Sequence, residues 1–114
     1  MPFLADQIVR FRKNMQDTIL PFWSTVGFQP DRRMFCESMT FSGTPNLYVP
    51  HRAMVQARQI FVFSHAARSN VYPVGGELAL QALDSLQRHF SNHGDLTQGL
   101  AFSISIADGS VLAS

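Results

Sequence analysis

The chain has 114 residues, the size of one small domain, and its single cysteine, Cys36, excludes an internal disulfide framework and suits the reducing cytoplasm. A net charge of +1 gives no reason to expect nucleic acid or an anionic membrane as a partner, and no apolar run is long enough to cross a bilayer. Charged residues make up 15%, against about 25% in typical soluble domains, so we expect either self-association through apolar faces or part of a larger fold.

The first predicted helix spans about residues 4 to 23. Its apolar residues recur at helical spacing: Ile8, Phe11, Met15, Ile19 and Phe22. Pro21 lies near its end and is expected to kink or terminate it, and Gly27 and Pro30 mark a turn. Residues 34 to 41 then alternate loosely and predict a short extended or hairpin segment, which the residues at 42 to 45 break off.

The second predicted helix, residues 51 to 69, follows Pro50. It is apolar on almost every face, which is typical of a buried helix. Arg58 lies among these apolar residues, and burying its guanidinium without a partner is costly.

A third helix is predicted after Pro73 and ends near His93-Gly94. Its inward residues are expected to be Ala79, Ala82, Leu83, Leu86 and Phe90, with Glu77, Gln81, Asp84 and Arg88 facing outward. Residues 102 to 106 alternate at period two before Asp108-Gly109, a strong hairpin signal, and the return arm is Val111-Leu112. The pattern therefore predicts an all-α fold class, mainly helical with short β-hairpins.

Arg58 is the most informative candidate for a functional site. In one interpretation, the Arg58 guanidinium reaches the surface or pairs with a nearby carboxylate. In the other, it is a fixed cation that binds an oxygen-rich ligand. His65 lies two turns along the same face, and Gln56 adds an amide on a different face. Arginine, histidine and aromatic rings such as Phe61 together suit a sugar, because rings stack on its apolar face and polar groups hold its hydroxyls.

The remaining candidates have simpler interpretations. Glu37 is either an acid in the pocket or a partner for an arginine such as Arg58 or Arg52. His89 and His93 have the spacing of a helical metal pair, but a third ligand is not apparent, so no metal site is expected. Cys36 has no adjacent cation that would lower its pKa, which favours a buried, inert thiol.

Several segments resemble the N-acylglucosamine 2-epimerase family, which also holds cellobiose 2-epimerases and mannose isomerases. Residues 55 to 64 (VQARQIFVFS) and Ala66 resemble its second-helix signature. Its F-x-E, G-x-P and R elements are matched in order and spacing by Phe35, Glu37, Gly43, Pro45 and Arg52. Residues 20 to 23 resemble the end of its first helix, and Asp108-Gly109 the hairpin before its next one, so the resemblance covers nearly the whole chain.

The resemblance implies that residues 1 to 114 are the N-terminal part of a single (α/α)6-barrel domain several times longer. It implies proton transfer at C2 of a reducing, mannose-like sugar through an enediolate, without cofactor or metal. The arginine of the family's Q-A-R motif carries over to Arg58, which would contact sugar oxygens and stabilise the enediolate. Gln56, Phe61, His65 and Glu37 are the further candidates for substrate binding.

The family's acid–base histidines are expected beyond residue 114, so the chain alone is expected to be inactive. Arg33-Met34 stands where the family commonly has a Gly-Gly pair, and Phe61 where Tyr or Trp is frequent, which bears on the choice of sugar. The alternative function is a small non-catalytic helical module that forms homo-oligomers through its phenylalanine-rich faces. An (α/α)6 glycoside hydrolase would need paired carboxylates, for which Glu37 alone is poor support.

Overall fold

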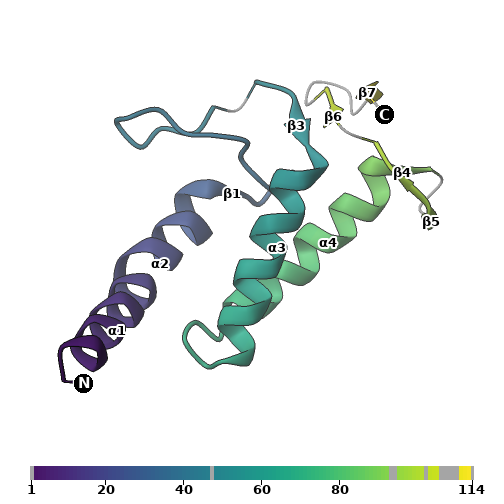
Figure 1. Ribbon diagram of the computed structural model, residues 1–114. Coiled ribbons are helices and arrows are strands. Elements are labelled where there is room, and N and C mark those ends of the chain that lie inside the picture. The colour runs from purple at the N-terminus through teal and green to yellow at the C-terminus, as the bar shows by residue number, and fades with distance from the viewer. Residues whose placement is uncertain (1, 47, 93–94, 102, 106–110, 114) are drawn as a thin grey trace.

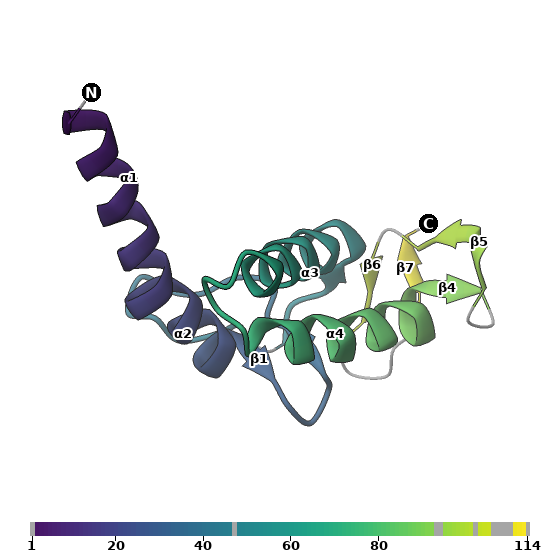
Figure 2. The same ribbon diagram turned by 90° about the horizontal axis from the view of Figure 1, so that it is seen from below.

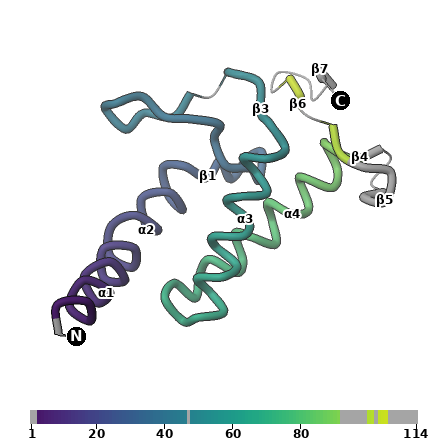
Figure 3. The backbone as a smooth tube through the Cα atoms, in the orientation of Figure 1, coloured from purple at the N-terminus to yellow at the C-terminus, as the bar shows by residue number. Residues whose placement is uncertain are grey.

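A computed structural model describes residues 2–46, 48–92, 95–101, 103–105 and 111–113 of the chain (Figures 1 and 3). The fold is mainly helical, with short antiparallel strands, as predicted. Figure 1 shows helices α3 (Ala53–Arg68) and α4 (Gly75–Phe90) side by side, and they are packed against each other. Figure 2 shows α1 (Pro2–Asn14) running away from this pair toward the N-terminus.

The first helical segment continues past Pro21 instead of ending there. After α1 come a π-helical turn η1 (Met15–Ile19), a short α2 (Leu20–Phe22) and a second π-helical turn η2 (Trp23–Gly27). A proline inside an α-helix removes one hydrogen bond and its ring presses on the carbonyl four residues earlier. The wider π turns on both sides of α2 are the local adjustment. Of the two outcomes expected at Pro21, a kink or the end of the helix, the structure therefore excludes the end, which comes at Gly27.

A tight hairpin follows this helical segment. β1 (Phe28–Gln29) pairs antiparallel with β2 (Met34–Phe35), in the register Phe28 with Phe35 and Gln29 with Met34. Arg33 takes the left-handed conformation, with φ 57°, and donates its N–H to the Gln29 carbonyl over 2.7 Å. Of the extended segment predicted over residues 34 to 41, only Met34–Phe35 form a strand, the second arm of a hairpin whose first arm carries no clear strand signal.

Two clusters of buried side chains form the core. The first joins the hairpin to α3 and α4 and contains Leu20, Phe28, Phe35, Phe63, Ala66, Ala79 and Ala82. The second lies at the other end of the helix pair and contains Met34, Ala53, Leu86, Phe90 and Ile104. Ile60 packs against both clusters and so connects them.

The predicted third helix corresponds to α4. Ala79, Ala82, Leu86 and Phe90 are buried as predicted, but Leu83 is 39% exposed. The helix ends at Phe90, earlier than predicted, and His93-Gly94 lie outside the described residues. The chain continues as β4 (Ser91–Asn92), which pairs antiparallel with β5 (Asp95–Leu100). The sequence pattern did not predict this hairpin, because it assigned the residues of β4 to the helix.

A three-stranded sheet lies at the start of α3. Its strand order is β3 (His51–Arg52), β6 (Ser103–Ile104) and β7 (Val111–Ala113), all antiparallel. The pairing of β6 with β7 confirms the arms of the predicted C-terminal hairpin, while Asp108-Gly109 lie outside the described residues. No sequence pattern indicated that β3 joins them.

Gly75, the first residue of α4, lies close to the backbone of α3. A Cβ atom there would lie 2.7 Å from the backbone oxygen of Phe63, a clash that neither helix can relieve by a rotamer change. We expect Gly75→Ala to lower the free energy of unfolding by about 1–3 kcal/mol, as overpacking does, measured by urea denaturation. Gly76→Ala is the control, because its Cβ would lie 3.4 Å from the Ala67 Cβ, and equal losses in both variants would contradict the prediction.

Candidate functional site

Helix α3 has one buried and one exposed face. The buried face carries Ala53, Gln56, Phe63 and Ala66. The exposed face carries Met54, Ala57, Arg58, Phe61, Val62, His65 and Arg68. The prediction of burial on every side was therefore wrong for this chain, because the described residues cover α3 on one side only. The exposed face nevertheless keeps the large apolar side chains that suggested burial.

Three of the five predicted site residues share this exposed face. Arg58 is exposed, and its guanidinium has no hydrogen bond or ion pair within the part of the chain that the structure describes. The Phe61 ring, 69% exposed, stacks on the His65 imidazole with the ring centroids 5.9 Å apart and the planes at 9°. Arg58 is thus not buried, and the face presents a free cation beside an aromatic pair.

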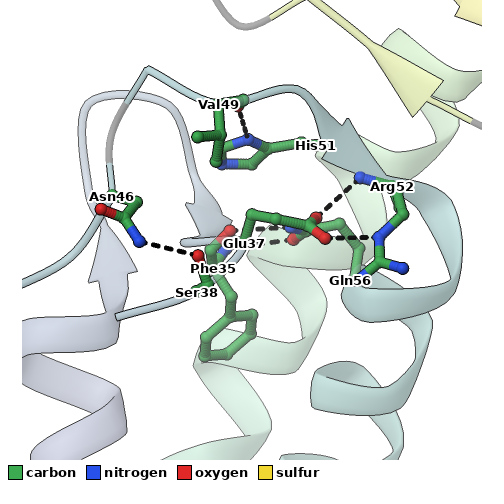
Figure 4. Close-up of polar contacts among 8 residues, drawn as sticks. All are labelled: Phe35, Glu37, Ser38, Asn46, Val49, His51, Arg52 and Gln56. Atoms are coloured by element: carbon green, nitrogen blue, oxygen red, sulfur yellow. Dashed lines mark hydrogen bonds and ion pairs between the residues drawn. The ribbon is translucent and has the colours of Figure 1, made fainter. Parts of the chain in front are cut away.

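Gln56 lies on a different face from Arg58, as its helical spacing predicted, and the structure shows that this face is buried. Its Oε1 accepts the backbone N–H of Phe35 over 3.0 Å, and its Nε2 donates to the Phe35 carbonyl over 2.7 Å (Figure 4). Only 1% of the residue is exposed. Both ends of the amide are therefore occupied in holding β2 against α3, away from the face that carries Arg58.

Glu37 pairs with Arg52, which is one of the two roles the sequence left open. Its carboxylate accepts the Arg52 backbone N–H over 2.9 Å and the Arg52 Nε–H over 2.5 Å (Figure 4). Arg52 is the residue that caps the N-terminus of α3. The hydrogen bonds of Glu37 with Arg52 and of Gln56 with Phe35 thus hold the start of α3 against β2 and the residues that follow it. Both contacts lie within two helical turns of Arg58.

His51 is a buried polar residue that no sequence signal distinguished. Its Nδ1 lies 3.0 Å from the Val49 carbonyl oxygen (Figure 4), and its Nε2 is buried without a hydrogen-bond partner in the described chain. Burial lowers the pKa of His51, because desolvation disfavours the charged ring. Burial likewise raises the pKa of the Cys36 thiol, which has no exposed surface, so its expected burial is confirmed.

The lowered pKa of His51 predicts a loss of stability in mild acid. Below about pH 6.5, the ordinary histidine pKa, the unfolded chain binds a proton that the folded chain does not, so unfolding is favoured as pH falls toward the folded-state pKa. We expect the urea midpoint to fall between pH 7 and 5.5, and the fall to shrink in His51→Gln. The fall should stay in His89→Gln, an exposed position on α4; a His51→Gln protein with an undiminished fall would contradict this assignment.

Other kinds of site have little support in the described ranges. Among those residues, no three His, Cys, Asp or Glu side chains are grouped so that they could hold a metal ion. His89 is exposed on α4, and His93 lies outside the described residues. The described helices include none that combines the length and apolar character needed to cross a membrane.

A cleft of about 290 Å³ lies beside the exposed face, between the first helical segment and the C-terminal half of α3. Its walls are Phe11, Arg12, Met15 and Leu20 on one side and Phe61, Val62, His65, Ala66, Ser69 and Val71 on the other. We call it the α1–α3 cleft. It includes the Phe61–His65 pair, but Arg58 is not part of its lining.

Comparison of the sequence with protein-family models and with curated protein sequences gives no match. The fold, however, is similar to that of a solved structure of a cellobiose 2-epimerase from Spirochaeta thermophila. The similarity has a TM-score of 0.84 and 26% sequence identity, and covers 99% of this chain and 27% of that chain. The chain therefore spans about a quarter of the length of that epimerase. Its fold is that of a portion of an (α/α)6 barrel, as the resemblance implied.

Proposed function

We propose that residues 1 to 114 form the N-terminal part of a single (α/α)6-barrel domain of a sugar epimerase or isomerase, acting on a reducing, mannose-like sugar. The observation that carries the proposal is the exposed face of α3, where Arg58, Phe61 and His65 lie together, in a fold shared with a cellobiose 2-epimerase. In a complete barrel this face would line the sugar pocket.

Arg58 has the chemistry that the proposed reaction requires. Removing the C2 proton of the open-chain aldose leaves an enediolate, whose negative charge develops on the sugar oxygens. A guanidinium stays protonated and offers several planar N–H donors, and in Arg58 no carboxylate among the described residues neutralises them. Its contribution to rate depends on contacts that strengthen as this charge develops.

The neighbouring residues would bind and orient the sugar. The stacked rings of Phe61 and His65 offer a flat surface for the apolar face of a pyranose, one or two turns from Arg58. The acid–base histidines would come from other helices of the barrel. Return of the proton to the opposite face of C2 gives the epimer, and return to C1 gives the ketose. Glu37 and Gln56 act by positioning α3 rather than by contact with the sugar.

Sugar binding to Arg58 is the direct test. We expect saturation-transfer NMR to detect weak D-mannose binding by the chain, and Arg58→Ala to weaken it about tenfold or more, because hydrogen bonds to a charged group contribute about 1.5–3 kcal/mol. Arg68→Ala, at the far end of the same exposed face, is the matched control and should bind normally. A folded chain without saturation transfer, or equal transfer in Arg58→Ala, would refute the proposal.

The same samples in D2O test where the acid–base groups lie. We expect no deuterium at C2 of mannose, because the histidines that move the proton are assigned to other helices. Deuterium uptake that disappears in Arg58→Ala would instead place a complete acid–base site within these residues and would implicate His65.

The alternative, a non-catalytic module that self-associates, is favoured by one observation. Phe3, Phe11 and Phe61 are all more than two-thirds exposed, on α1 and α3. Such a module would form a stable dimer and its stability would be indifferent to Arg58→Ala.

A further inference from the structure

His51 is a fully buried histidine in which only one ring nitrogen has a partner. Its Nδ1 lies 3.0 Å from the Val49 carbonyl oxygen, and because a carbonyl can only accept, Nδ1 carries the proton. A neutral ring in this form has a lone pair on Nε2, which is buried without a hydrogen-bond partner in the described chain. A second proton would therefore create a buried N–H donor that finds no acceptor among the described residues, which is costly.

The surroundings of the ring offer little to stabilise a positive charge. Glu37, in the residues that follow β2, favours the charged ring, while Arg32, in the turn between β1 and β2, disfavours it. The Glu37 carboxylate lies next to the His51 ring in Figure 4, but it already accepts the backbone N–H and the Nε–H of Arg52. β6, which pairs with β3, carries only uncharged residues, and so do the first four positions of α3.

Acid therefore favours any state in which the His51 ring meets water. Burial lowers the pKa of His51 in the closed structure, whereas an exposed ring has the ordinary pKa of about 6.5. Below about pH 6.5, the open state binds a proton that the closed state does not, so the open state becomes more populated as the pH falls.

The smallest movement that exposes the ring separates β3 from β6. β3 has only two residues, His51 and Arg52, and both pair with β6. Residues 48–50, which precede β3, are all exposed, so moving them outward exposes little further apolar surface. Helices α3 and α4, in contrast, have 16 residues each and contribute to both core clusters. Opening at β3 is therefore expected to occur without unfolding of the helices.

We propose that His51 is a pH-sensitive switch: in mild acid, residues 48–52 separate from β6 while α3 and α4 stay folded. The separation breaks the contacts between Arg52 and Glu37, because Arg52 is the other residue of β3. It also frees β6 and β7 from the strand that joins their sheet to the start of α3. The switch follows from the packing around β3 and does not depend on sugar binding.

Hydrogen exchange of the Arg52 amide is the test, because this N–H donates to the Glu37 carboxylate only in the closed state. Exchange rates are measured by NMR at pH 7.5 and 5.5, with and without low concentrations of urea, and corrected for the intrinsic effect of pH. We expect opening to increase about threefold to tenfold on acidification, the range that one histidine allows. Low urea should leave this opening unchanged but speed exchange of the slowest α4 amides, because global unfolding exposes far more surface.

Two variants and the ring itself provide the controls. His51→Gln keeps an amide that can donate to the Val49 carbonyl but cannot titrate, so its opening should not depend on pH. His89→Gln changes an exposed histidine of α4 and should keep the full acid response. In the unaltered chain, nitrogen NMR of the imidazole at pH 7.5 should show the proton of His51 on Nδ1, a result that requires no variant to fold.

Three results would overturn the proposal. The first is an Arg52 amide whose exchange has the same urea dependence as the slowest α4 amides, because opening would then be global. The second is an acid response that remains undiminished in His51→Gln. The third is a His51 ring that carries its proton on Nε2, or is already charged, at pH 7.5.

Discussion

Replacing Phe63 with alanine is expected to lower the free energy of unfolding by about 3–5 kcal/mol, the usual cost of removing a buried phenylalanine ring. Phe63 has no exposed surface. Its ring stacks on the Phe35 ring with the centroids 5.1 Å apart, and it contacts the Tyr72 ring edge-on with the centroids 6.1 Å apart. These contacts join α3 to the hairpin and to the loop before α4. The free energy of unfolding of small domains is only about 5–15 kcal/mol, so a large fraction of the Phe63→Ala molecules should unfold in mild denaturant.

Urea denaturation followed by the fluorescence of Trp23, which packs against the first core cluster, measures this loss. Phe61→Ala is the matched control, because it makes the same change two residues earlier on the same helix, at a side chain that is 69% exposed. The control should change stability by less than about 0.5 kcal/mol. Similar losses in the two variants would show that α3 does not bury the face that the structure assigns.

The second large effect is expected at Gln56. Gln56→Met keeps the length of the side chain but leaves the Phe35 N–H and carbonyl buried without partners. Each unsatisfied backbone group costs about 1–3 kcal/mol, so the variant should lose about 2–6 kcal/mol of stability. Phe35 itself is fully buried, and water cannot replace the lost hydrogen bonds without opening the core.

Urea denaturation and amide hydrogen exchange together check this prediction. The Phe35 amide should lose its protection in Gln56→Met ahead of the helix amides of α4. Gln59→Met is the matched control, since Gln59 lies one turn further along α3 and its amide has no hydrogen bond in the described chain. A Gln56→Met protein as stable as this control would remove the positioning role proposed for Gln56.

Phe63 and Gln56 both hold the candidate sugar site in place. Phe63 and Gln56 anchor the buried face of α3, and Glu37 binds Arg52, the residue that directly precedes the helix. The opposite face, with Arg58, is therefore presented by a helix that is fixed along its length. A site on a rigid element keeps its donors in place while the charge of an enediolate develops.

The helical parts of the fold were predictable from the sequence alone. Apolar residues at a spacing of three and four positions located the first and third helical segments, and a nearly continuous apolar run after Pro50 located the second. Asp108-Gly109 indicated the C-terminal hairpin whose arms are paired. The same periodicity placed Arg58 and His65 on one face and Gln56 on another. The resemblance of residues 55 to 64 to a sugar epimerase signature agrees with the fold of the cellobiose 2-epimerase.

Only the tertiary structure decided which faces are covered. Periodicity states which residues share a face, but α3 is apolar on both faces, so its composition did not reveal that Phe63 is buried and Phe61 exposed. The partners of Gln56 and Glu37 are 21 and 15 residues away along the chain, and no local pattern encodes such pairings. Strands of two residues, such as β1 and β3, are too short to carry an alternating signal. Their pairing depends on long-range contacts, which exist only once the helices have packed.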